Sequence, residues 1–148
     1  MDDFVADTIF IDATSERVFS ALLEPEELLE WLEVQEARVA RAEGGEFTVL
    51  SADGSTRGGT ISELVDGERL KVDDFYYEHD GVRRGPMTLT FTIRPEDYGV
   101  WITVRQDSLD RLDEGQLDGG AGWKDFADAT RREWVRATVS LKRWIEQI

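Results

Sequence analysis

Residues 34–107 contain six consecutive segments in which apolar and polar side chains alternate, with only turn signals between them. The separators are EGGE, ADGS, VDGE, EHDGVRRGP and RPEDYG, which are rich in residues that favour turns. Because these separators are too short to hold a helix, successive strands are expected to pair as an antiparallel meander. The strands are predicted near residues 35–43, 45–52, 56–65, 69–78, 86–94 and 98–107.

The alternation also assigns side chains to the two faces of the predicted sheet. It is clearest in MTLTFTI, where the apolar residues face a core and the threonines face water, and it continues in VWITVRQ. The residues expected to point inward are Met87, Leu89, Phe91 and Ile93 in the first stretch and Val100, Ile102, Val104 and Gln106 in the second.

A strand and two short helices are predicted ahead of the meander. Residues 4–12 alternate in the manner of a strand. In the stretch ATSERVFSALLEPEELLEWL, Thr14 or Ser15 can cap a first helix because a hydroxyl accepts a hydrogen bond from a free N–H group. Pro25 ends that helix and suits the first turn of a second one. The apolar residues of the two helices are Val18, Phe19, Leu22 and Leu23, and Leu28, Leu29, Trp31 and Leu32.

A long amphipathic helix is predicted after the glycine-rich loop SLDRLDEGQLDGGAG. About 26 residues at 1.5 Å per residue span roughly 39 Å. Such a helix needs a broad surface to lie on, and a six- or seven-stranded antiparallel sheet supplies one. One face of the helix, with steps of four and three residues, reads Trp123, Ala127, Thr130, Trp134, Ala137, Leu141, Trp144 and Ile148.

Composition limits the classes of function. The length of 148 residues predicts one domain spanning residues 1–148, and the absence of cysteine excludes disulfides and thiolate chemistry. The net charge of -15 argues against nucleic-acid binding and against anionic membranes. The chain has no apolar run long enough to cross a membrane, and its start, MDDFVADTIFID, does not resemble a signal peptide. A cytoplasmic location is therefore expected.

Several stretches resemble a known family. They are IDATSERVFSALLEPEELLEWL, GGEFTV, GGTISELVDGERL, TLTFTI and the GW that opens the last helix, in the family's order along nearly the whole chain. The sequence resembles the START-like (SRPBCC) superfamily, in the branch similar to the C-terminal domain of the activator of the heat-shock protein 90 ATPase. The resemblance implies an α+β helix-grip fold, in which a curved antiparallel sheet wraps around the C-terminal helix.

The resemblance also implies a cavity between the sheet and the last helix. Large side chains at an incompletely filled interface can shape such a cavity, although they can equally form plain core. Glu63 and Gln106, which share faces with apolar neighbours on their strands, would orient a polar group of the ligand. The residues expected to line the cavity are Trp123, Phe126, Thr130 and Trp134 on the helix and Trp31, Tyr76, Phe91 and Ile102 in the surrounding shell.

Polar residues within the alternation are the candidates for chemistry. Asp74 alternates with Val72 and Tyr76, so it could point inward, but a strand bulge would reverse that direction. For Glu63, pairing with an arginine or a place at the sheet rim is the favoured interpretation. His79, the only histidine, could act as a general base or as a metal ligand with Glu78 or Asp80. Adjacent residues on a strand point to opposite sides, which favours a solvated turn histidine.

Three hypotheses for function remain open. The leading one is a protein that binds a small hydrophobic or aromatic ligand, including lipid-like molecules, without a cofactor or a metal. The second is an enzyme, a cyclase, dehydratase or hydrolase that uses an inward carboxylate. The third is a co-chaperone-like interaction protein whose partner is a heat-shock 90-type chaperone. A second copy of the chain is a further candidate partner.

Overall fold

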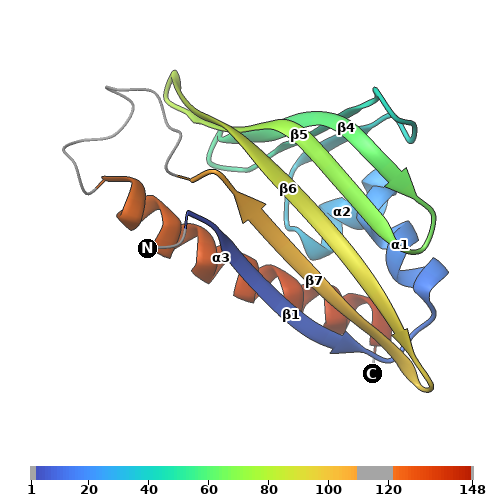
Figure 1. The fold of residues 1–148 in the computed structure, drawn as a ribbon. Helices are drawn as coiled ribbons and strands as arrows, with labels where there is room; N and C mark the ends of the chain where they lie inside the picture. Colours follow the sequence, from blue (N-terminus) through green and yellow to red (C-terminus); the bar gives the residue numbers. More distant parts are fainter. Residues whose placement is uncertain (1–2, 110–121, 148) are drawn as a thin grey trace.

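The computed structural model describes residues 3–109 and 122–147, and these residues form one seven-stranded sheet and three helices (Figure 1). The strands are all antiparallel, in the order β1-β7-β6-β5-β4-β3-β2. The elements are β1 (Val5–Ile11), α1 (Ser15–Leu23), α2 (Pro25–Trp31), β2 (Glu36–Val39), β3 (Glu46–Leu50), β4 (Thr56–Val65), β5 (Arg69–His79), β6 (Val82–Glu96), β7 (Gly99–Asp107) and α3 (Gly122–Glu146).

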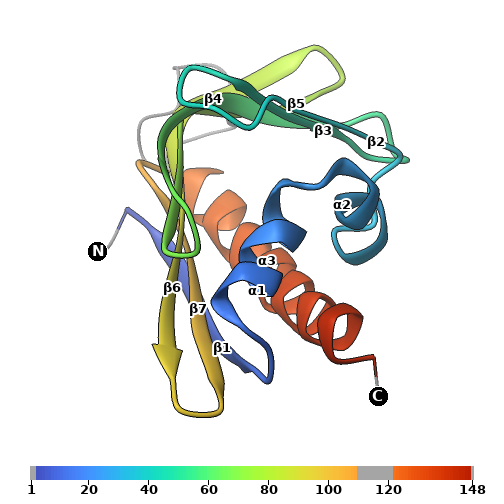
Figure 2. The ribbon, with the colours of Figure 1, turned by 90° about the vertical axis from the view of Figure 1, so that its right-hand side faces the viewer.

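The sheet is strongly bent around the helices. In Figure 2, β1, β7 and β6 form an upright wall, and the sheet then turns over into a roof that carries β2 and β3. The three helices lie in the angle between wall and roof. The structure is thus the predicted α+β helix-grip fold. None of the described helices is long and apolar enough to cross a membrane.

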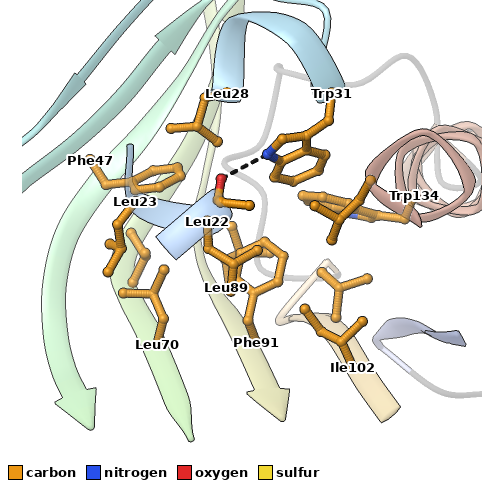
Figure 3. Packing of buried hydrophobic residues seen from close by; sticks show 14 of the residues in the cluster. Leu22, Leu23, Leu28, Trp31, Phe47, Leu70, Leu89, Phe91, Ile102 and Trp134 are labelled. Atoms are coloured by element: carbon orange, nitrogen blue, oxygen red, sulfur yellow. Dashed lines mark hydrogen bonds between the residues drawn. The ribbon is translucent and has the colours of Figure 1, made fainter. Parts of the chain in front are cut away.

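The two short helices begin and end as the sequence predicts. The hydroxyl of Thr14 accepts a hydrogen bond from the backbone N–H of Arg17 at 3.1 Å, which caps α1. Pro25 is the first residue of α2. At the end of α2, the indole N–H of Trp31 donates to the backbone oxygen of Ala21 at 2.8 Å, so the two helices are fixed to each other (Figure 3).

The core lies on the concave face of the sheet, where the predicted inward residues of β6 and β7 are all buried. In Figure 3 the side chains of Leu89 and Phe91 lie between the short helices and α3. The rings of Phe91 and Trp134 meet edge to face with centroids 5.8 Å apart, an arrangement that aromatic quadrupoles favour.

Helix α3 is held against β1 by polar contacts as well as by its apolar stripe. The hydroxyl of Thr138 donates to the carboxylate of Asp7, and Lys142 Nζ donates to the backbone oxygen of Phe10 at 2.7 Å. The backbone N–H of Asp12 donates to Glu146 Oε2 at 2.9 Å. Lys142 Nζ also donates to Glu146 Oε2, at 2.8 Å, and the bonds from Asp12 and Lys142 lower the pKa of Glu146. Helix α3 consequently lies closest to β1, α1 and α2.

The apolar stripe of α3 agrees with the predicted face. Ala127, Thr130, Trp134 and Leu141 are buried, and Trp123, Ala137 and Trp144 are half-buried. Ile148 and residues 110–121 of the predicted loop lie outside the described residues.

A bulge in β5 corrects one part of the predicted register. Asp74 has φ +52° and is exposed, and the pairing with β6 shifts between Val72 and Phe75. The extra residue reverses the direction of the side chains that follow. Phe75 and Tyr77 therefore point inward, and Tyr76, predicted on the inner face, carries its ring under the guanidinium of Arg83, 3.9 Å from the centroid.

The turn between β5 and β6 is shorter than the predicted separator EHDGVRRGP. Asp80 and Gly81 have φ values of +53° and +79°, and His79 pairs with Val82 across them. Positive φ at both central residues is the signature of a two-residue hairpin turn whose twist matches that of the strands. Strand β6 therefore begins at Val82 rather than near residue 86.

The bulge gives a stability test. Asp74→Val is expected to lower the free energy of unfolding by about 1–2 kcal/mol, because a β-branched residue disfavours a left-handed backbone. Asp73→Val, at the neighbouring position, whose φ is not positive, is expected to change it by less than about 0.5 kcal/mol. Urea denaturation of both variants measures the difference, and equal losses would contradict the bulge.

Candidate functional site

Two half-open clefts lie between the concave face of the sheet and the helices. The first, of about 590 Å³, is lined by β4, β5, β6, β7 and the first half of α3. The second, of about 540 Å³, is lined by the end of α2, the β3–β4 turn and the middle of α3. Arg57, Tyr77 and Glu133 line both, so the two clefts meet at these three side chains.

The clefts follow from where α3 rests. The helix is attached to β1, at one end of the bent sheet, and lies farther from β4 and β5. Ala129 and Thr130, which line the first cleft about one turn of α3 before Trp134, have small side chains. The space on this side is therefore only partly filled by side chains.

A row of side chains crosses the inner face of the sheet at the junction of the clefts. In the strand register, Val49 on β3 pairs with Arg57 on β4, Arg57 pairs with Tyr77 on β5, and Tyr77 pairs with Arg84 on β6. Cross-strand neighbours on one face lie within contact distance of each other. The row therefore brings two guanidinium groups to opposite sides of one tyrosine.

Arg57 has a distinctive electrostatic environment. Its side chain lies on the inner face of the sheet and keeps part of its surface accessible, because both clefts open onto it. Burial lowers the pKa of Arg57, and the negative charges of Glu133 and Asp53 act in the opposite direction. The guanidinium of an arginine stays charged in proteins, so Arg57 is a cation. It forms no ion pair with a carboxylate of residues 3–109 or 123–147.

Tyr77 lies beside Arg57 and is half-buried. Burial raises the pKa of Tyr77, and the carboxylates of Asp53 and Glu133 add to that effect. The phenol therefore keeps its proton at neutral pH and is a hydrogen-bond donor. Its ring lies 5.8 Å from the ring of Phe126.

The floor of the first cleft is fixed by a chain of hydrogen bonds. The indole N–H of Trp134 donates to Gln106 Oε1 at 2.9 Å, and Gln106 Nε2 approaches Met87 Sδ at 3.2 Å. Gln106 and Trp134 are 3% and 5% exposed, so both polar groups depend on these partners. This chain sets the orientation of Trp134 at the base of the cleft.

Phe126 and Arg84 cover the outer part of the first cleft. The guanidinium of Arg84 lies 5.1 Å from the centroid of the Phe126 ring, a distance typical of cation–π contacts. His79 also lines this cleft near the β5–β6 turn, with Nε2 3.3 Å from the backbone oxygen of Asp53 and Nδ1 3.9 Å from Asp80 Oδ2.

The structure places half of the sequence-predicted residues at the clefts. Gln106, Phe126, Thr130 and Trp134 line the first cleft, and Trp31 lines the second. The remaining five lie elsewhere: Phe91 and Ile102 are buried in the core, Trp123 packs half-buried against it, and Tyr76 and Glu63 line neither cleft.

Glu63 is turned away by a second irregularity. The register of β4 against β5 shifts between Ile61 and Glu63, so Glu63 no longer shares the inner face with Ile61. Its carboxylate instead pairs with Arg69 at 2.9 Å, which is the interpretation that the sequence favoured. Gln106 is thus the one of the two predicted polar residues that reaches a cleft.

Sequence reasoning missed Arg57, Tyr77 and Arg84. Arg57 could have been found, because it lies four residues before the inward Ile61 and alternation therefore places both on the same face of the strand. Tyr77 could not, because the bulge at Asp74 is invisible in the alternation. Arg84 lies in the stretch that was interpreted as a turn.

Comparison with known proteins places the chain in a family. A family model described as activator of Hsp90 ATPase homolog 1-like protein matches residues 12–131. The chain belongs to this family. None of the curated protein sequences compared with the chain matches it significantly.

Solved structures of this fold are numerous. One is protein MLL2253 from Mesorhizobium loti, with a TM-score of 0.76, 16% identity and 97% coverage of both chains. Another is the Aha1 dimer from Colwellia psychrerythraea, with a TM-score of 0.72, 14% identity and coverage of 97% and 96%. DynU16, from the dynemicin biosynthetic locus, has a TM-score of 0.73 and 17% identity over 99% of this chain and 48% of its own. At these identities, the likeness shows the fold alone.

The bond between Trp134 and Gln106 gives a testable prediction. Gln106→Leu leaves the indole N–H without its acceptor, and this is expected to cost about 1–3 kcal/mol of unfolding free energy. In a Trp134→Phe background, which has no N–H to satisfy, the same change is expected to cost less. A double-mutant cycle by urea denaturation measures the coupling, and zero coupling would show that the bond does not orient Trp134.

Proposed function

We propose that this protein binds a small molecule in the first cleft, with an apolar or aromatic body and at least one polar group. The observation that carries the proposal is a cleft of about 590 Å³ with aromatic rings and convergent polar side chains on the same walls. Ligand sites in proteins are typically concave, mostly apolar and about 300–1,000 Å³ in volume.

The first cleft has both apolar and polar lining residues, which would contact different parts of a ligand. Phe75, Phe126 and Trp134 present apolar surface for the body of a ligand. Thr130 and Tyr77 present hydroxyl groups along the same cleft, above the Gln106–Trp134 bond, and these would fix the orientation of a ligand. The mixture supports an amphipathic ligand rather than a pure hydrocarbon.

The enzyme hypothesis has less support. It requires an inward carboxylate, and the two that the sequence offered, Glu63 and Asp74, line neither cleft. The carboxylates that do line the clefts, Glu133 among them, were not part of that hypothesis. DynU16 comes from a biosynthetic locus, and this accords with a fold that handles small molecules without assigning a reaction to this chain. The family's name refers to activation of a chaperone ATPase, but no surface of the described residues singles out a chaperone as partner.

A cleft-filling substitution tests the proposal. Ala129 lines the first cleft on α3, and Ala129→Phe would occupy the space where the ligand body is expected. The variant is expected to keep its circular dichroism spectrum and to bind more than about tenfold more weakly. Binding of fatty acids, sterols and aromatic polyketides is measured by the shift of the Trp134 indole N–H resonance, assigned with Trp134→Phe.

The matched control is Ala6→Phe, the same change at an exposed position of β1 that lines neither cleft. It is expected to bind as the original protein does. Equal binding by the two variants would place the ligand outside the first cleft, and no resonance shift with any compound would refute the proposed function.

A further inference from the structure

The group at the junction of the two clefts indicates what a ligand would carry. We propose, on the basis of the function proposed above, that the ligand bears a single carboxylate that pairs with the guanidinium of Arg57. Its apolar body would extend into the first cleft, between Phe126 and Trp134.

Arg57 is placed for such a role by the strand register. It stands between Val49 and Tyr77 on the inner face of the sheet, and it is one of three residues that line both clefts. A guanidinium is planar and offers parallel N–H donors, so it matches the two oxygens of a carboxylate. A ligand entering either cleft would therefore meet the same charged group.

Arg57 forms no close ion pair with a carboxylate of the described residues. A buried cation normally forms an ion pair with good hydrogen-bond geometry, because losing water costs several kcal/mol otherwise. Arg57 is partly withdrawn from solvent, and Glu133 and Asp53 act on it only at longer range. A bound carboxylate would supply the missing partner.

Arg84, on the other side of Tyr77 in the row, already has an aromatic partner. Arg84 lies over the ring of Phe126, 5.1 Å from its centroid, so its charge is partly directed to that ring. Of the two guanidinium groups that line the first cleft, Arg57 is thus the one without a cation–π or ion-pair partner among the described residues.

The carboxylates of Asp53 and Glu133 favour a ligand with a single negative charge over one with two. Asp53 accepts hydrogen bonds from the hydroxyl and the backbone N–H of Ser55, at 2.6 and 2.9 Å, and these bonds lower the pKa of Asp53. It therefore stays ionised at neutral pH, and Glu133 lines the same junction. A dianion such as a phosphate monoester would be repelled by both carboxylates more strongly than a monoanion would be.

Tyr77 completes the recognition of an oxyanion. Because its environment keeps the phenol protonated, its hydroxyl can donate a hydrogen bond beside the guanidinium. Two neighbouring donors, one charged and one neutral, distinguish a carboxylate from a carboxamide, whose NH₂ group would face them with its own donors.

A pair of matched probes tests the inference. Naphthalene-2-carboxylate and naphthalene-2-carboxamide share one ring system and differ in charge. The full-length protein is expected to bind the carboxylate about 10- to 100-fold more tightly, as the strength of a charge-assisted hydrogen bond implies. Isothermal titration calorimetry gives the two affinities, and the shift of the Trp134 indole N–H resonance shows whether each probe occupies the first cleft.

Substitution then assigns the preference to one residue. In Arg57→Met the preference for the carboxylate is expected to fall to within about twofold, while the carboxamide binds as before. Arg38→Met is the control, because Arg38 is exposed, pairs with Glu36 and lines neither cleft. Retention of the full preference in Arg57→Met would overturn the inference.

The outcomes separate this inference from the proposed function. Equal affinity of the unsubstituted protein for both probes, with a shift of the Trp134 resonance, would overturn the carboxylate assignment and leave small-molecule binding standing. This comparison needs no variant to fold. If neither probe nor any compound of the wider panel moved the resonance, the proposed function would fail, and the carboxylate assignment with it.

Discussion

The attachment of α3 to β1 is the constraint on which the rest of the structure depends. A bent sheet offers the helix two surfaces at an angle, and a straight helix can pack closely against only one of them. The bonds from Thr138 to Asp7 and from Lys142 to the backbone of Phe10 select the β1 wall. The far side of the helix then faces β4 and β5 across a gap that side chains bridge incompletely, and both clefts lie there.

Strand irregularities determine which side chains face that gap. The shift before Glu63 removes a carboxylate from the inner face, and the bulge at Asp74 brings Phe75 and Tyr77 onto it. A regular β5 would have presented Asp74 and Tyr76 instead. The junction of the clefts therefore holds a cation and a neutral phenol from the sheet beside the carboxylate of Glu133 from α3, and the proposed anion would be bound by the first two groups.

The sequence predicted the fold far better than the site. Alternation, the Thr14 cap, Pro25 and the stripe of α3 each depend on local chemistry, and the structure agrees with them. The site depends on which face a side chain takes after a bulge, and a bulge is fixed by tertiary packing rather than by a local pattern. Gln106 and Trp134 point inward, as the patterns of their elements predict, because β7 and α3 are regular. Phe91 and Ile102 were predicted to line the cavity but are buried in the core. Alternation predicts that a side chain points inward, but it does not tell whether that side chain lines a cleft or packs in the core.

A crystal structure of the ligand-free protein tests the central claim most directly. The account predicts open space between α3 and strands β4 and β5, with the guanidinium of Arg57 reaching it from the sheet and the indole of Trp134 bonded to Gln106 at its base. Helix α3 packed against β4 and β5, with the side chains of Phe126 and Trp134 filling the space over Arg57, would contradict it.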